Sequence, residues 1–234
     1  MEKGQEAVAR FLRQRVELGA FDLLFEERMT GATAAKSPPG SLPAGAVPEG
    51  YEELRATALA CTRCPLAGGR TQVVFSDGNP QARLVVVGEA PGANEDRTGL
   101  PFVGAAGKLL DLLLASVGLS REVSVYICNV IKCRPPGNRN PQPIEIEACS
   151  PYLRRQIEFV RPEAILAVGT FAARLLVGSD RPIGELRGKI HSYEGTPLVV
   201  TYHPAALLRN PSWTRASWDD LQLLCGVLDA DNRP

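Results

Sequence analysis

Four of the six cysteines have the spacing of a metal site. Cys61 and Cys64 form a Cys-x2-Cys pair, and Cys133 and Cys149 follow further along the chain. Thiolates grouped in this way bind either a zinc ion or an iron–sulfur cluster, and the spacing alone leaves both open. Six cysteines are too few to staple a chain of 234 residues with disulfides. The pattern therefore predicts a metal centre in a reducing compartment.

A second group of reactive side chains follows three short apolar runs. The turn Gly-Glu-Ala-Pro-Gly at residues 88–92 follows the first run, Asn129 ends the second, and His203 follows the third. Such runs are typical of buried parallel strands, whose carboxyl ends meet at one edge of a sheet and collect ligands there. A carboxylate, an amide and an imidazole at this edge could bind a polar ligand and move protons. A plain strand-to-helix turn at residues 88–92 is the alternative.

An aromatic ring and three basic loops could hold a flat, charged ligand. Phe102 lies beside a glycine turn, where it could be a core residue or a platform for a flat ring. The formal net charge is zero, so affinity for phosphates must come from local patches. The basic loops contain Lys132, Arg134 and Arg139; Arg187 and Lys189; and Arg209 and Arg215. Solvated surface charge is the alternative interpretation of these loops.

Apolar runs that alternate with helical patterns indicate the elements that position these residues. The expected strands are residues 83–88, 123–129, 164–168 and 198–202. The expected helices are residues 51–60, 104–117, 143–160, 170–177 and 212–228. Residues 203–211 are expected to form an exposed loop. We therefore predict a three-layer α/β/α fold with a central, mainly parallel four-stranded sheet.

The chain divides into a long domain and an N-terminal appendage. Residues 1–29 contain apolar side chains at helical spacing and predict an amphipathic helix. Residues 30–50 are rich in Gly, Pro, Ala and Ser and read as a flexible linker, because they cannot bury much apolar surface. The globular domain is expected over residues 51–234. The N-terminal helix either packs back on this domain or docks a protein partner.

Composition limits where the protein can work. Apolar residues make up 44% of the chain, which is ordinary for a globular protein. No apolar run approaches ~18 residues, so no membrane span is expected. The N-terminus lacks the apolar segment of a signal peptide. We expect a cytoplasmic monomer.

Four motifs, together with the cysteine spacing, resemble those of a known enzyme family. In order they are Gly88-Glu89-Ala90-Pro91-Gly92 with Glu95-Asp96, Pro101-Phe102-Val103-Gly104-x-Ala106-Gly107, Asn129-Val130-x-Lys132-Cys133-Arg134-Pro135-Pro136, and His203-Pro204-Ala205-x-Leu207-Leu208-Arg209. The chain resembles the family 4 uracil-DNA glycosylases, the iron–sulfur branch of that superfamily, over residues 51–228. The resemblance implies hydrolysis of the N-glycosidic bond of deoxyuridine in DNA, which releases uracil and leaves an abasic site for base excision repair. It also implies one [4Fe–4S] cluster on Cys61, Cys64, Cys133 and Cys149.

The resemblance assigns roles in a pocket for an extruded base. Phe102 would stack on the uracil ring, Asn129 would pair with its edge, and His203 would stabilise the departing base. The pocket wall would come from Gly88, Glu89, Ala90 and Gly92. The best-known branch of the superfamily has an aspartate at the position of Ala90. The group that positions the attacking water therefore stays open between Glu89 and backbone carbonyls of the turn.

DNA contacts follow from the same resemblance. Leu207 or Leu208 would fill the hole that the extruded base leaves, as an apolar wedge. Contacts to phosphates would come from Lys132, Arg134, Arg139 and Arg209.

Two other functions compete with excision. One is a protein of the same fold that binds uracil-containing DNA without efficient turnover, which in one branch uses a histidine in an inserted arginine-rich loop. Residues 186–191 superficially resemble that loop, but the insertion is absent. The other is an iron–sulfur electron carrier, which would explain the cysteines but not Asn129, Phe102 or His203.

Overall fold

A six-stranded sheet forms the centre of the molecule, in the order β1-β3-β2-β4-β6-β5. The computed structural model describes residues 50–230. The strands are β1 (Asp77–Gly78), β2 (Leu84–Gly88), β3 (Val125–Asn129), β4 (Ala164–Val168), β5 (Ile190–Tyr193) and β6 (Thr196–Thr201). The four inner strands are parallel, while β1 and β5 pair antiparallel at the two edges. The predicted α/β fold with a mainly parallel sheet is confirmed. The predicted number of four strands is wrong, because the sheet has six.

The two additional strands lack the signals by which buried strands are recognised. β1 has only two residues. β5 alternates between exposed and half-buried positions and contains no apolar run. It joins β6 through Glu194 and Gly195, which both have positive φ angles, as a tight hairpin turn requires. Both strands are therefore edge strands held mainly by backbone pairing.

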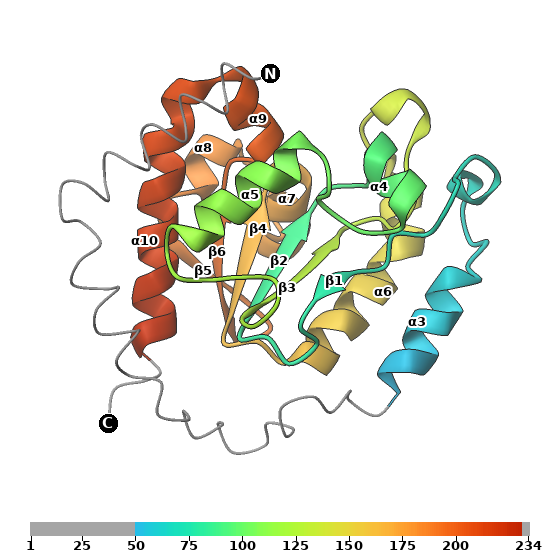
Figure 1. The fold of residues 1–234 in the computed structure, drawn as a ribbon, viewed down its shortest axis with the longest axis horizontal. Coiled ribbons are helices and arrows are strands. Elements are labelled where there is room, and N and C mark those ends of the chain that lie inside the picture. The colour runs from blue at the N-terminus through green and yellow to red at the C-terminus, as the bar shows by residue number, and fades with distance from the viewer. Residues whose placement is uncertain (1–49, 231–234) are drawn as a thin grey trace.

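Helices cover both faces of the sheet (Figure 1). One face packs against α5 (Ala105–Ala115), α9 (Pro204–Arg209) and α10 (Thr214–Ala230). The other packs against α3 (Tyr51–Leu59), α6 (Pro143–Val160), α7 (Thr170–Val177) and α8 (Ile183–Leu186). Leu84 and Val86 of β2 belong to the first core and Val85 and Val87 to the second, because side chains alternate along a strand. The three-layer prediction is confirmed.

The five expected helices occur with ends within two residues of their predicted bounds. Three short helices were missed, namely α4 (Ala93–Thr98), α8 and α9. The stretch expected to be an exposed loop is instead α9 followed by a 3₁₀ turn, η3 (Pro211–Trp213). Pro204 fits the first turn of α9 because it needs no hydrogen-bond partner for its nitrogen.

The inner strands end at one edge of the sheet. Gly88 pairs in register with Asn129, and Val168 pairs with Thr201. After β2 the chain adds β3 on one side of it and β4 on the other, which opens a crevice where the connections diverge. The residues after β2, β3, β4 and β6 therefore converge at this edge.

The predicted N-terminal helix and, apart from Gly50, the predicted linker fall outside the described residues. Within residues 50–230, none of the helices has the length and apolar character that crossing a membrane requires.

Candidate active site

A cleft of about 630 Å³ lies at the carboxyl ends of the inner strands. Its wall brings together predicted residues from four separate segments: Glu89, Ala90 and Gly92 after β2, Phe102 before α5, Asn129 at the end of β3, and His203 after β6. Arg139 and Arg209 lie on the same wall. The four motifs therefore meet in one cleft, although residues 89 and 203 are far apart in the chain.

Gly88 provides the space in which two of these side chains sit. A Cβ atom at this position would lie 2.4 Å from Asn129 Oδ1 and 2.6 Å from two ring carbons of Phe102. Gly88 is thus required by close approach of side chains, since its backbone is an ordinary strand conformation.

Asn129 presents a buried acceptor that is not satisfied within the protein. The residue is 2% exposed, and its Oδ1 has no hydrogen-bond partner among the described residues. The backbone around it is fixed: Val130 N–H donates to Gly88 O at 2.9 Å, and Lys132 Nζ donates to Asn129 O at 2.6 Å. Buried polar atoms without partners are rare and costly, so this oxygen is positioned for a ligand N–H.

Phe102 is held in a strained backbone conformation. Its φ angle is 54°, which is uncommon for a bulky side chain. Arg121 Nη2 donates to Phe102 O at 2.6 Å, and Gly107 leaves room, because a Cβ there would lie 1.7 Å from the same oxygen. The ring stacks on the His203 imidazole with centroids 5.6 Å apart and planes 26° apart. The strain is therefore maintained by the surroundings and places a flat ring in the cleft.

Glu95 joins the two loops that form this wall. Its Oε1 accepts hydrogen bonds from Val103 N and Gly104 N, each at 2.9 Å, and its Oε2 accepts from Gly92 N at 3.1 Å. Glu95 belongs to the first of the four motifs, but no function was expected for it. A carboxylate three residues after Gly92 at the start of α4 is a helix-capping pattern and could have indicated this contact.

His203 begins α9 with its ring fixed in one tautomer. Ala205 N–H donates to His203 Nδ1 at 3.1 Å, so in the neutral ring the proton resides on Nε2. Burial lowers the pKa of His203 to about 4, and the positive charge of Arg209 acts in the same direction. The imidazole is therefore neutral near pH 7 and offers one N–H donor.

The low pKa of His203 predicts a pH-dependent loss of stability. Between pH 6.5 and about 4 the unfolded chain binds a proton at this histidine that the folded protein does not, so acid favours unfolding. Thermal unfolding midpoints should fall more steeply over this range in the wild type than in His203→Gln, which does not titrate. Parallel curves for the two proteins would contradict the burial of a neutral imidazole.

Glu89 lies half-buried in the wall of the cleft. Burial raises the pKa of its carboxyl group. A carboxylate with a raised pKa at the edge of a binding cleft is suited to accept a proton from water.

Two predicted DNA contacts are wrong because the side chains are buried. Lys132 is 2% exposed and donates to Asn129 O, so its ammonium cannot reach a phosphate. Leu207 is 0% exposed and packs in the core beneath α9, so it cannot act as a wedge. A helix in place of the expected loop turns Leu207 inward and leaves Leu208 only partly buried.

The basic side chains that were predicted to contact DNA differ in their hydrogen-bond partners and in their exposure. Arg139 donates to both oxygens of the buried Glu145 carboxylate at 2.9 and 2.6 Å, which fixes the loop before α6. Arg134 is half-buried and donates to Asn138 Oδ1 at 2.7 Å. Arg209 is exposed at the rim of the cleft. Arg209 is therefore well placed to meet a charged ligand.

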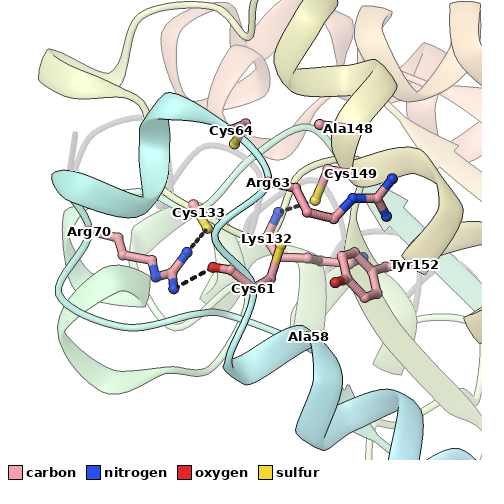
Figure 2. A pocket seen from close by; sticks show the side chains of 10 residues that line it. All are labelled: Ala58, Cys61, Arg63, Cys64, Arg70, Lys132, Cys133, Ala148, Cys149 and Tyr152. Atoms are coloured by element: carbon pink, nitrogen blue, oxygen red, sulfur yellow. Dashed lines mark hydrogen bonds between the residues drawn. The ribbon is translucent and has the colours of Figure 1, made fainter.

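The four cysteines singled out by their spacing line a second, separate cavity, shown in Figure 2. Arg70 Nη1 donates to Cys133 Sγ at 3.3 Å, and Lys132 N–H donates to Cys149 Sγ at 3.3 Å. The sulfur atoms face a common space, but within residues 50–230 they do not form a tight group of three or more ligands around one point. The four predicted thiols therefore line one cavity, but they do not converge on the position of a single metal ion.

Several residues of the cleft were not predicted. Gly169 and Thr170 contribute the start of α7, and a Cβ on Gly169 would lie 3.1 Å from His203 Cβ. Tyr202 and Trp213 form a stacked pair on the same wall. Tyr202 falls at the end of an expected strand, and Trp213 carried no signal because a single tryptophan near a helix start is usually a packing residue.

Comparison with known proteins gives a consistent result. Residues 75–222 match the model of the uracil DNA glycosylase superfamily. A type-4 uracil-DNA glycosylase of Archaeoglobus fulgidus is 42% identical over 189 residues, which cover 76% of this chain and 94% of that protein. The type-4 enzyme of Thermotoga maritima is 50% identical over 154 residues, covering 65% and 80%. That of Sulfurisphaera tokodaii is 42% identical over 183 residues, covering 74% and 83%.

These matches span the segments that build the cleft. Residues 75–222 include the turn after β2, Phe102, Asn129 and His203, as well as Cys133 and Cys149. The resemblance of the motifs, the convergence of their residues and the identity to several type-4 enzymes agree. The chain therefore belongs to the uracil-DNA glycosylase superfamily, within its type-4 branch.

Proposed function

We propose that this protein removes uracil from DNA by hydrolysing the N-glycosidic bond, as a step of base excision repair. The observation that carries the proposal is the unpaired Oδ1 of Asn129, buried in the same cleft as Phe102 and His203. The relatives named as type-4 uracil-DNA glycosylases support it.

Recognition of uracil follows from the geometry of the cleft. The base must leave the helical stack to reach a cleft of this kind. Phe102 offers a ring for stacking, and Asn129 Oδ1 can accept the N3–H of uracil while its amide NH₂ donates to a carbonyl. A site that pairs with a base through the Asn129 amide rejects a base that lacks an N–H at the position of uracil N3.

Bond cleavage places negative charge on the departing uracil. His203 is neutral and presents its Nε2 proton, so it can donate to a uracil carbonyl as that charge develops. Water adds to C1′ of the sugar as the bond to the base breaks. We assign Glu89 as the acceptor of the water proton, because burial raises the pKa of its carboxyl group and it lies on the cleft.

An excision assay tests this function. The protein is incubated with an oligonucleotide that contains one uracil, then with alkali, which cleaves strands at abasic sites. Cleavage at the uracil position is expected, with none in a matched oligonucleotide that has thymine there. Tight binding of the uracil strand with no alkali-sensitive site would instead support the binding protein of the same fold.

The enzyme should be monofunctional, without strand cleavage of its own. A lyase step needs a lysine amine that forms a Schiff base with the sugar. Among the described residues no lysine lines the cleft, and Lys132 lines the cysteine cavity. Borohydride should therefore trap no covalent enzyme–DNA adduct during excision, and recovery of such an adduct would contradict the assignment.

We propose that Cys61, Cys64, Cys133 and Cys149 hold one [4Fe–4S] cluster. The donor set fits, because four thiols face one cavity and two of them already accept N–H hydrogen bonds, which stabilise thiolates. When bound, the cluster supplies a cross-link between the segment after α3, the loop after β3 and α6. Its function is structural and needs no redox cycle.

Metal analysis tests the cluster. Protein purified without oxygen should be brown and contain about four irons per chain. Cys61→Ala should lose the colour and lower the thermal unfolding midpoint, while Cys225→Ala, which changes a buried cysteine of α10 outside the cysteine cavity, should keep the colour. A colourless, fully active protein containing zinc would contradict the proposal.

DNA outside the cleft would be held by the surface around it. Arg209, Arg134 and Arg139 are the proposed phosphate contacts and Leu208 the proposed wedge, now that Lys132 and Leu207 are excluded by burial. The monomeric state, the cytoplasmic location and a protein partner for the N-terminal helix stay predictions.

A further inference from the structure

Trp213 exposes a large aromatic surface beside the candidate active site. The residue is 40% exposed and lies on the wall of the cleft. Among the large apolar side chains that are exposed within residues 50–230, Trp213 alone lines the cleft. An exposed tryptophan on a binding cleft is better explained by a ligand than by packing of the core.

The indole ring is stacked and not free to fold away. It stacks on the Tyr202 ring with centroids 4.6 Å apart and planes 24° apart. The Arg187 guanidinium lies over the Tyr202 ring at 5.4 Å from its centroid. We call Arg187, Tyr202 and Trp213 the ladder. Trp213 stacks on the Tyr202 ring, and the Arg187 cation contacts the same ring, and both contacts hold the two rings in place.

The ladder is anchored to the protein at both ends. Arg187 donates to both oxygens of the fully buried Asp220 carboxylate at 3.0 and 2.9 Å, and also to Ala216 O. At the other end, Pro211 opens the turn η3, and Trp213 N–H donates to Asn210 O at 3.1 Å. The stacked rings of Tyr202 and Trp213, which we call the platform, are therefore ordered before any ligand binds. This order lowers the entropic cost of stacking a base on Trp213.

The platform lies one residue from the proposed uracil pocket. Tyr202 and His203 are consecutive and joined by a trans peptide bond, so their Cα atoms are ~3.8 Å apart. His203 stacks with Phe102, and Tyr202 stacks with Trp213, and all four side chains line the same cleft. Arg209, at the exposed rim, supplies positive charge for the phosphates that would connect two neighbouring nucleotides.

We propose that Trp213 stacks on the nucleobase next to the uracil in the same DNA strand. This inference rests on the proposed function and deepens it. A base that loses its uracil neighbour to the pocket exposes one flat face, and the indole ring can cover it. Stacking requires only a π-face, so the platform should accept any of the four bases.

The test uses three oligonucleotides that each contain one uracil. One has normal neighbours, one has a tetrahydrofuran abasic analogue on the 5′ side, and one has it on the 3′ side. Single-turnover excision is measured below saturation. In the wild type, one of the two abasic neighbours should lower the rate about 10-fold, because a stacked base is lost.

Trp213→Ala should lower the rate on the normal strand by about the same 10-fold and show no further loss on the sensitive abasic strand. Trp213→Phe should keep the sensitivity, since phenylalanine can still stack. The matched control is Leu112→Ala, which removes an apolar side chain of similar exposure, 47%, that does not line the cleft. It should behave like the wild type.

The outcomes separate the platform from the proposed function. A Trp213→Ala enzyme that stays sensitive to the abasic neighbour, or that loses the same factor on all three strands, would overturn the platform while excision stands. A wild type that releases no uracil from the normal strand would overturn the proposed function itself. If Trp213→Ala does not fold, Trp213→Leu replaces it, because leucine fills the space next to Tyr202 without stacking on a base.

Discussion

Replacing His203 with alanine is expected to lower single-turnover excision of uracil about 100-fold or more and to leave affinity for uracil-containing DNA nearly intact. The neutral imidazole presents one N–H, fixed by the bond from Ala205 N–H to Nδ1, toward charge that exists only as the base departs. A donor directed at developing charge contributes about 3–4 kcal/mol to the transition state, and little before it. Single-turnover rates and equilibrium binding, measured on the same strand, test the expectation.

Arg209→Ala is the matched comparison, because this arginine lies six residues further along on the same helix and is exposed. It should weaken binding to DNA of any sequence and reduce the dependence of binding on salt, with a smaller effect on the rate of the bound complex. Equal losses of rate and affinity in both variants would mean that residues 203–209 act as one folding unit, and the separate assignments would have to be dropped.

Asn129→Ala should cause the second large loss, about 100-fold in single-turnover excision below saturation, because uracil then leaves water without a partner for its N3–H. A strand with N3-methyl-deoxyuridine separates this hydrogen bond from other effects. The wild type should excise the methylated base much more slowly than uracil, whereas Asn129→Ala should treat the two bases more nearly alike.

The assignment would be contradicted if the wild type and Asn129→Ala discriminated equally between uracil and its N3-methylated form. In that case the buried Oδ1 of Asn129 would not contact N3–H, and its lack of a partner in the protein would need another cause. Unchanged thermal unfolding midpoints in Asn129→Ala would show that a lower rate does not come from a damaged fold.

The predicted parts of the fold are those in which local pattern and burial agree. β2, β3 and β4 are runs of five residues buried on both faces, and their apolar sequences indicated where they lie, although β3 begins at Val125 and not at residue 123. β1 and β5 are edge strands whose pairing depends on the backbone and on a turn with positive φ at Glu194 and Gly195, so side-chain patterns carry little signal for them.

The residues that follow strands meet in the cleft, whereas two residues expected at the surface are buried. Asn129 and His203 converge because parallel strands end at one edge. Leu207 and Lys132 were expected to be exposed because they lie in polar, proline-containing stretches. Tertiary packing decides their burial: α9 packs on α5, and the Lys132 ammonium finds Asn129 O inside the protein.

Other features depend on contacts between distant segments and have no local signature. The stack of Trp213 on Tyr202 brings η3 against the exit of β6, and the Arg187–Asp220 pair behind it joins residues 33 positions apart. The sulfur cavity is different, because the cysteine spacing did indicate which four thiols share it.

Mass spectrometry of the products most directly tests the central claim that the cleft cleaves only the bond between uracil and its sugar. A single-uracil oligonucleotide is incubated with the wild type, and both the strand and the small molecules are weighed. The account predicts free uracil and a full-length strand whose uracil has been replaced by a hydroxyl group. An unchanged strand, a strand cut at the uracil, or release of the base still attached to its sugar would contradict it.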